Sequence, residues 1–174
     1  PKVPRYPEGA PVVVHVTPGI LLGGVDEFPF TLTDFGFIEL RFLWPGDKSK
    51  PQPDGNIWES GGPARRGPFS DTSALRAAAS VLAFAVGRTT TIDGRKLRDY
   101  VVRTQALTGN TGVIGWSQGG NAAAAAMGVY GNQFPELQWY ASWESPFGSG
   151  TLDGEFGTHA QPNPFYDSER GSID

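Results

Sequence analysis

The stretch TGVIGWSQGGNAAAAAM, residues 111–127, decides how this chain folds. Its first five residues are small or apolar and indicate a strand, whereas its alanine-rich second half is a strong helix former. Between the two, Gly115 and Gly119 lack the Cβ atoms that would collide with neighbouring backbone in a very tight turn. The pattern predicts a strand, a sharp turn with Ser117 at its tip, and a helix that ends near Tyr130.

The five residues at this turn have the form G-x-S-x-G. Between a strand and a helix, this form is typical of a nucleophile elbow, which presents a reactive serine. The N-terminus of the following helix also favours negative charge that develops beside Ser117. The pentapeptide alone is a weak signal in a chain with 24 glycines, so its context carries the prediction. The alternative is that Ser117 only caps the alanine-rich helix.

Strands and helices alternate along the rest of the chain. Residues 11–17, 37–44 and 137–143 are rich in β-branched and aromatic side chains and indicate three more strands. Residues 74–86 repeat apolar side chains at helical spacing. Residues 95–107 are expected to add a second helix or to extend the first one after a break at residues 93–94. This alternation predicts an α/β fold, with a mostly parallel sheet and flanking helices.

Residues typical of helix caps and loops indicate where the predicted elements begin and end. Ser70 or Asp71 is expected to cap the helix at 74–86 and Gly87 to stop it, while Gly131 and Asn132 form a good C-terminal cap for the later helix. Loops are expected at 20–36, with one helical turn, at 45–69, and from Glu144 onward. The 174 residues are interpreted as a single domain with a core at 11–145 and a loop-rich tail at 146–174.

Composition excludes several kinds of site. The absence of cysteine excludes disulfides, thiol catalysis and thiolate metal ligands, and two histidines are too few for an imidazole-rich metal centre. A net charge of −4 gives no electrostatic case for nucleic acid or an anionic membrane, and no apolar run reaches membrane-spanning length. We expect no cofactor and no metal. The chain begins at Pro1 without methionine, which favours a processed, secreted or periplasmic protein over a cytoplasmic one.

The order of these pieces resembles the α/β-hydrolase family over roughly residues 11–145. Residues 11–17 are similar to the strand before the oxyanion loop, and residues 115–120 to the elbow. The resemblance implies that Ser117 is the nucleophile and that the backbone N–H of Gln118 is one oxyanion donor. It implies a second donor in the loop after the first strand, near Gly19 or Ile20, and the alternative is that residues 18–19 form an ordinary turn.

The family also requires an acid and then a histidine after the serine. Glu144, at the end of the strand after the nucleophile helix, is a candidate acid, and its alternative is a capping or ion-paired glutamate. His159 is the only histidine after Ser117 and a candidate base, with an exposed loop histidine as the alternative. His15 precedes the serine inside a strand and is expected to be a hydrogen-bonded core or oxyanion-support residue.

Only 57 residues follow Ser117, whereas the remaining part of the family's fold would need roughly 85. We therefore expect the C-terminal part of that fold to be missing. A companion polypeptide or a continuation of the chain would then supply further strands and the catalytic histidine.

The leading functional hypothesis is a serine hydrolase that cleaves a small carboxylic ester, with an amide or peptide as the alternative substrate. The alternative is a non-catalytic hydrolase-like domain that serves binding or assembly. A nucleotide-phosphate loop is disfavoured, because the glycine-rich stretch lacks the G-x-x-x-x-G-K-[ST] pattern.

Overall fold

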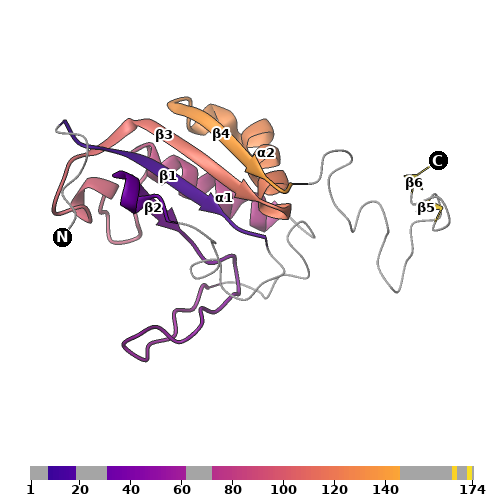
Figure 1. The fold of residues 1–174 in the computed structure, drawn as a ribbon, viewed down its shortest axis with the longest axis horizontal. Helices are drawn as coiled ribbons and strands as arrows, with labels where there is room; N and C mark the ends of the chain where they lie inside the picture. Colours follow the sequence, from indigo (N-terminus) through magenta and orange to yellow (C-terminus); the bar gives the residue numbers. More distant parts are fainter. Residues whose placement is uncertain (1–7, 19–30, 62–71, 146–165, 168–171, 174) are drawn as a thin grey trace.

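The computed structural model describes residues 8–18, 31–61, 72–145, 166–167 and 172–173 (Figure 1). Its centre is a four-stranded parallel sheet with the strand order β2-β1-β3-β4. Two helices lie against one face of this sheet (Figure 1). The predicted α/β class is confirmed, with a sheet that is parallel throughout. The strands are β1 (Ala10–Val16), β2 (Ile38–Arg41), β3 (Ala106–Trp116) and β4 (Leu137–Trp143), and the helices are α1 (Thr72–Ala85) and α2 (Gln118–Tyr130).

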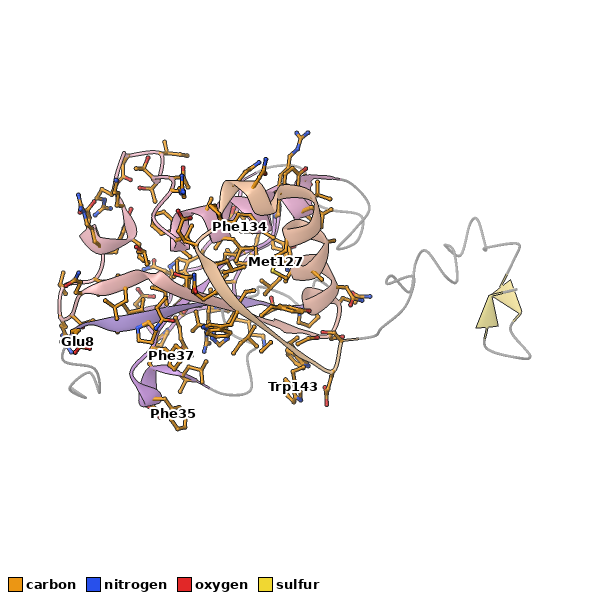
Figure 2. The ribbon with its side chains drawn as sticks, turned by 90° about the horizontal axis from the view of Figure 1, so that it is seen from above. Glu8, Phe35, Phe37, Met127, Phe134 and Trp143 are labelled. Carbon is orange, nitrogen blue, oxygen red and sulfur yellow. The ribbon has the colours of Figure 1, made fainter. Side chains whose placement is uncertain are left out.

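Both faces of the sheet are apolar at its centre, and β1 is buried along its whole length. Alternate residues Val12, Val14 and Val16 pack against the small and apolar side chains of the two helices. Val13 points to the opposite face, where it forms a second, smaller cluster with Ile114. The residues packed against these two are Leu32, Phe37, Trp116 and Trp139. Figure 2 separates the two layers, with Met127 and Phe134 on the helix side and Phe35 and Phe37 on the other.

The strand order creates a topological switch point between β1 and β3. From β1 the chain moves outward to β2, then crosses back past β1 to reach β3 and continues in the opposite direction to β4. In open parallel sheets, ligands bind in the crevice at the carboxyl ends of the two strands where this direction reverses. Thr17 follows β1 and Ser117 follows β3 at that edge. The topology therefore places the G-x-S-x-G turn where this class of fold builds its sites.

The predicted helix at 95–107 is wrong. Only one 3-10 turn forms there, η2 (Leu97–Asp99), and residue 106 already belongs to β3. This strand is longer than the predicted 111–115, because Ala106 and Leu107 pair with Ala10 and Pro11 before a register shift. Pairing with a strand nearly one hundred residues earlier overrides the local helical pattern.

The predicted strand at 37–44 is shorter in the structure. The ladder of β2 ends at Arg41, and residues 42–44 leave the sheet. Trp44 is fully buried, and its indole N–H donates a hydrogen bond to the carbonyl oxygen of Thr17 at 3.2 Å. Residues 42–44 therefore bend away from β1, and the Trp44 indole lies against the residue that follows this strand.

The remaining predicted boundaries have mixed outcomes. The expected helical turn within 20–36 is η1 (Thr33–Phe35), and Gly87, with φ of 82°, stops α1 as predicted. Gly131 caps α2 with an ordinary right-handed φ of −56°, because the chain tightens there into η3 (Gly131–Gln133). Ser70 and Asp71 lie outside the described residues.

The expectation of loop throughout the chain after Glu144 is wrong at two places. Two short strands, β5 (Tyr166–Asp167) and β6 (Ser172–Ile173), pair with each other in antiparallel orientation. Strands of two residues are too short to produce an alternating pattern that a sequence could reveal.

Candidate functional site

Ser117 occupies a strained turn between β3 and α2. Its φ of 51° and ψ of −129° lie outside the ordinary regions, and among the described residues only Glu144 also combines a side chain with positive φ. Such a conformation costs about 1–3 kcal/mol and persists only where the surroundings hold it. Here the Ser117 N–H donates to the Trp143 carbonyl and the Gly120 N–H donates to the Ser117 carbonyl, both at 2.9 Å. The predicted sharp turn is confirmed, and the serine makes no side-chain capping hydrogen bond.

The glycines of the turn permit backbone contacts that a side chain would block. A Cβ on Gly119 would lie 2.1 Å from the carbonyl oxygen of Val16 and 2.6 Å from the carbonyl carbon of Thr17. A Cβ on Gly115 would lie 2.2 Å from the Cα of Gly120. Atoms cannot approach this closely, so only glycine lets the first turn of α2 press against the exit of β1. The N-terminus of α2 therefore lies at the switch point itself.

The backbone N–H of Gln118 also lies at this place. It belongs to the first residue of α2, and the described residues offer it no acceptor. The Gln118 side chain is buried, and within the described part of the chain its Oε1 atom has no hydrogen-bond donor. The predicted second donors, Gly19 and Ile20, lie outside the described residues. Thr17, two residues before Gly19, accepts a hydrogen bond at its carbonyl oxygen from the indole of Trp44.

Two indoles lie together at the ends of β3 and β4. The parallel register places Trp116 opposite Trp143, and their rings stack with centroids 5.5 Å apart and planes 21° apart. The Trp116 indole N–H donates to the Glu144 carboxylate at 3.2 Å. Trp116 directly precedes Ser117 in the chain, but the sequence does not reveal this stack. Only the register of β3 against β4 brings Trp143 to the same face.

Glu144 lies one residue beyond β4, with φ of 51° and an exposed side chain. Its carboxylate is therefore near the end of β3 but is engaged by an indole, and its role as the catalytic acid stays a prediction. His159 lies outside the described residues, so its role as the base also stays a prediction.

His15 is completely buried on the face of the sheet opposite the helices. Its Nε2 lies 3.3 Å from a carboxylate oxygen of Glu39. Glu39 also accepts hydrogen bonds from the Thr31 hydroxyl at 3.0 Å, from the backbone N–H of Leu32, and from Arg41 at 3.2 Å. Burial lowers the pKa of His15 to about 4; the charge of Glu39 opposes this shift and that of Arg41 adds to it. The histidine is thus a neutral core residue, and Glu39 ties residues 31–32 to the sheet.

The pKa of His15 predicts a loss of stability in mild acid. The unfolded chain takes up a proton near pH 6.5, whereas the folded protein resists it until about pH 4. Lowering the pH from 7 to 5 should therefore cost about 2 kcal/mol of unfolding free energy, with no such effect above pH 7. Urea unfolding at both pH values measures the cost. The variant His15→Gln should lose this dependence, and an equal pH dependence in both proteins would contradict the assignment.

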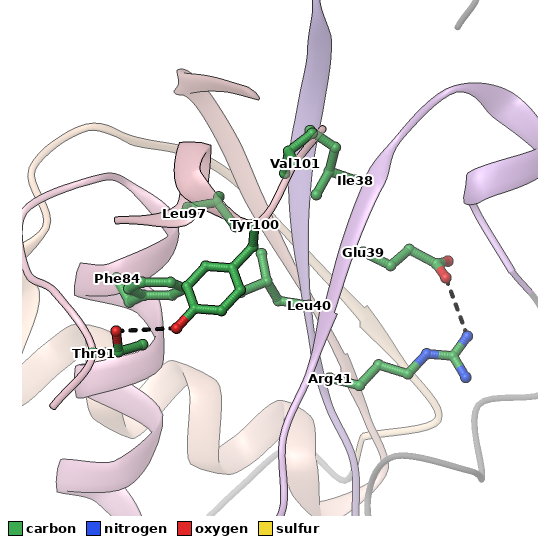
Figure 3. Close-up of a pocket in the computed structure, with 9 residues that line it drawn as sticks. All are labelled: Ile38, Glu39, Leu40, Arg41, Phe84, Thr91, Leu97, Tyr100 and Val101. Atoms are coloured by element: carbon green, nitrogen blue, oxygen red, sulfur yellow. Dashed lines mark hydrogen bonds and ion pairs between the residues drawn. The ribbon is translucent and has the colours of Figure 1, made fainter. Parts of the chain in front are cut away.

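A cavity among the described residues lies away from the serine turn. About 540 Å³ in volume, it opens at the outer edge of β2, two strands away from Ser117 (Figure 3). Figure 3 shows Tyr100 beside Phe84 and Leu40, with its hydroxyl donating to Thr91 at 3.2 Å, while Glu39 and Arg41 point away. Sequence reasoning missed this cavity, because β2 and residues 84–101 meet only in the folded chain. Its lining residues are Ile38, Glu39, Leu40, Arg41, Phe84, Thr91, Leu97, Tyr100 and Val101.

No protein-family model matches this chain, and no curated protein or solved structure matches it. The function is therefore argued from the geometry. Within the described residues, no three His, Asp or Glu side chains are grouped as metal ligands. None of the described helices has the length and apolar character needed to cross a membrane.

Proposed function

We propose that this protein is a serine hydrolase that cleaves a carboxylic ester, with Ser117 as the nucleophile. The observation that carries the proposal is the strained φ of Ser117 at the switch point between β1 and β3. Strained backbone conformations of this kind cluster at functional sites, where they hold a side chain in a fixed direction. The resemblance of the G-x-S-x-G turn to a nucleophile elbow supports the same function.

In this proposal the Ser117 Oγ attacks the carbonyl carbon of the ester while a histidine accepts its proton. The carbonyl oxygen becomes an oxyanion that accepts hydrogen bonds from preorganised backbone N–H groups. The Gln118 N–H, which has no acceptor among the described residues, is one donor. The family resemblance assigns the second to Gly19 or Ile20. Expulsion of the alcohol leaves an acyl-enzyme, which water then hydrolyses.

His15 does not suit the role of the base. It is completely buried, lies beside the Glu39 carboxylate, and has a pKa lowered to about 4. We therefore propose that the base is either His159 or a histidine of a companion polypeptide or continuation.

The variant His159→Asn separates these two sources. If His159 is the base, the variant should lose about 10³-fold or more in esterase rate while keeping its unfolding temperature. If the base comes from a companion or a continuation, the rate should not change. Intact-mass analysis of native material should then find either a second species or a chain heavier than 18.6 kDa. An unchanged rate in a protein of 18.6 kDa alone would contradict both sources.

The alternative is a non-catalytic binding or assembly domain. The cavity at the edge of β2 favours it, since six of its nine lining residues are apolar or aromatic and none belongs to the serine turn. Within the described part of the chain, no strand pairs with the outer edge of β2 or of β4. Covalent labelling of Ser117 by a fluorophosphonate, argued in the Discussion, distinguishes the enzyme from this alternative.

A further inference from the structure

Gly120 joins the serine turn to β4. Its backbone N–H donates to the Ser117 carbonyl oxygen, and its own carbonyl oxygen accepts a hydrogen bond from the Tyr140 hydroxyl, both at 2.9 Å. The Ser117 N–H donates in turn to the Trp143 carbonyl oxygen, also at 2.9 Å. Tyr140 and Trp143 both belong to β4. This strand therefore holds the turn at two places, once at the serine and once three residues later.

Packing leaves no room for a side chain at Gly120. A Cβ added there would lie 1.9 Å from the Oγ of Ser145 and 3.0 Å from the Oγ of Ser142. On the side of β3, a Cβ added to Gly115 would lie 2.2 Å from the Gly120 Cα. These contacts fix where Gly120 lies, but they do not fix the direction of its carbonyl group. The hydrogen bond from Tyr140 supplies that direction.

The Tyr140 hydroxyl is not needed to satisfy the Gly120 carbonyl. In an α-helix the carbonyl groups of the first turn accept hydrogen bonds from N–H groups four residues later, and only the last turn leaves carbonyls unpaired. Tyr140 is also 39% exposed, so water could hydrate its hydroxyl. A second hydrogen bond to such a carbonyl restricts movement of the first turn without satisfying a buried polar group. The bond therefore suits a role in positioning.

We propose that Tyr140 is a positioning residue: through Gly120 its hydroxyl holds the first turn of α2, and with it the Gln118 N–H, where the oxyanion forms. The effect on rate rests on the proposed function, whereas the hold on the turn does not. A preorganised donor acts in the transition state, since the oxyanion does not yet exist in the bound ester. Loss of the hydroxyl should therefore lower kcat and leave KM unchanged.

The test uses Tyr140→Phe in the full chain, a variant that keeps the aromatic ring and removes only the hydroxyl. Steady-state assay with a chromogenic ester should show kcat lower by about fivefold or more with KM unchanged, and fluorophosphonate labelling should slow by the same factor. Amide hydrogen exchange measured by NMR should become at least about fivefold faster at Ser117 and Gly120, because both N–H groups donate hydrogen bonds that hold the turn. An unchanged kcat, or a lower kcat without faster exchange, would overturn the inference.

Tyr100→Phe is the matched control. Tyr100 is 43% exposed, and its hydroxyl donates to Thr91 at 3.2 Å in the cavity at the edge of β2. This variant loses the same chemical group, but it should change neither kcat nor exchange in the serine turn. If Tyr140 had only a structural role, the two variants would differ from the wild type in unfolding temperature alone, and this result would also overturn the inference.

The same measurements on the wild type separate this inference from the proposed function. A wild type without labelling of Ser117 and without ester turnover, together with faster exchange in Tyr140→Phe, would refute the hydrolase and support the hold of Tyr140 on the turn. Labelling of Ser117 with equal kcat and equal exchange in the wild type and in Tyr140→Phe would refute the positioning role alone.

Discussion

Ser117→Ala is expected to abolish labelling of the protein by a fluorophosphonate and to lower the rate of ester hydrolysis by about 10³-fold or more. The serine oxygen is the atom that forms the acyl bond in the proposed mechanism, so its loss cannot be offset by binding. The residual rate would come from the backbone donors alone, which stay in place because α2 begins at Gln118 in both proteins.

Mass spectrometry of the labelled peptide identifies the modified residue, and a chromogenic ester gives the rate. Ser80→Ala is a suitable control, since Ser80 is an exposed serine on α1. It should label and turn over like the wild type. If Ser117→Ala hydrolyses the ester at the wild-type rate, the hydrolase proposal fails and the binding domain becomes the better interpretation.

Gly119→Ala is expected to lower the free energy of unfolding by about 3 kcal/mol, because its Cβ would overlap the backbone of Val16 and Thr17. Backbone atoms in a buried strand cannot move aside as the end of a flexible side chain can. In a chain of this length the loss corresponds to a fall of about 6–12 °C in unfolding temperature. Because the clash lies two residues from Ser117, labelling of the serine should also slow.

Gly128→Ala is the matched control within the same helix. Gly128 is exposed, and a Cβ there would meet no atom within 4 Å. Alanine is the better helix former, so this variant should gain about 0.5–1 kcal/mol. Calorimetric melting of both variants measures the contrast. Similar unfolding temperatures for the two would show that α2 does not approach β1 as closely as the structure has it.

Local sequence predicted those parts of the fold that local sterics control. The helical spacing at 74–86 predicts α1. The glycines around Ser117 permit the tight turn at φ of 51°, because they carry no Cβ that would collide with neighbouring backbone. Residues 95–107 failed as a helix, because the first residues of β3 form their ladder with β1 and not with their own neighbours. Strand pairing across the sheet outweighed the local helix propensity there.

Some features of the candidate site follow from local sequence, and others depend on tertiary structure. The sequence by itself determined that Ser117 stands between a strand and an alanine-rich helix, within a parallel α/β architecture, since these depend on neighbouring residues and on alternation along the chain. Tertiary structure alone decided that this turn lies at a switch point, that His15 meets Glu39, and that Trp143 stacks on Trp116. Each of these contacts joins residues 24 or more positions apart and depends on strand order and register. A shift of one residue in register moves every side chain of a strand to the other face, so no local pattern can fix such contacts.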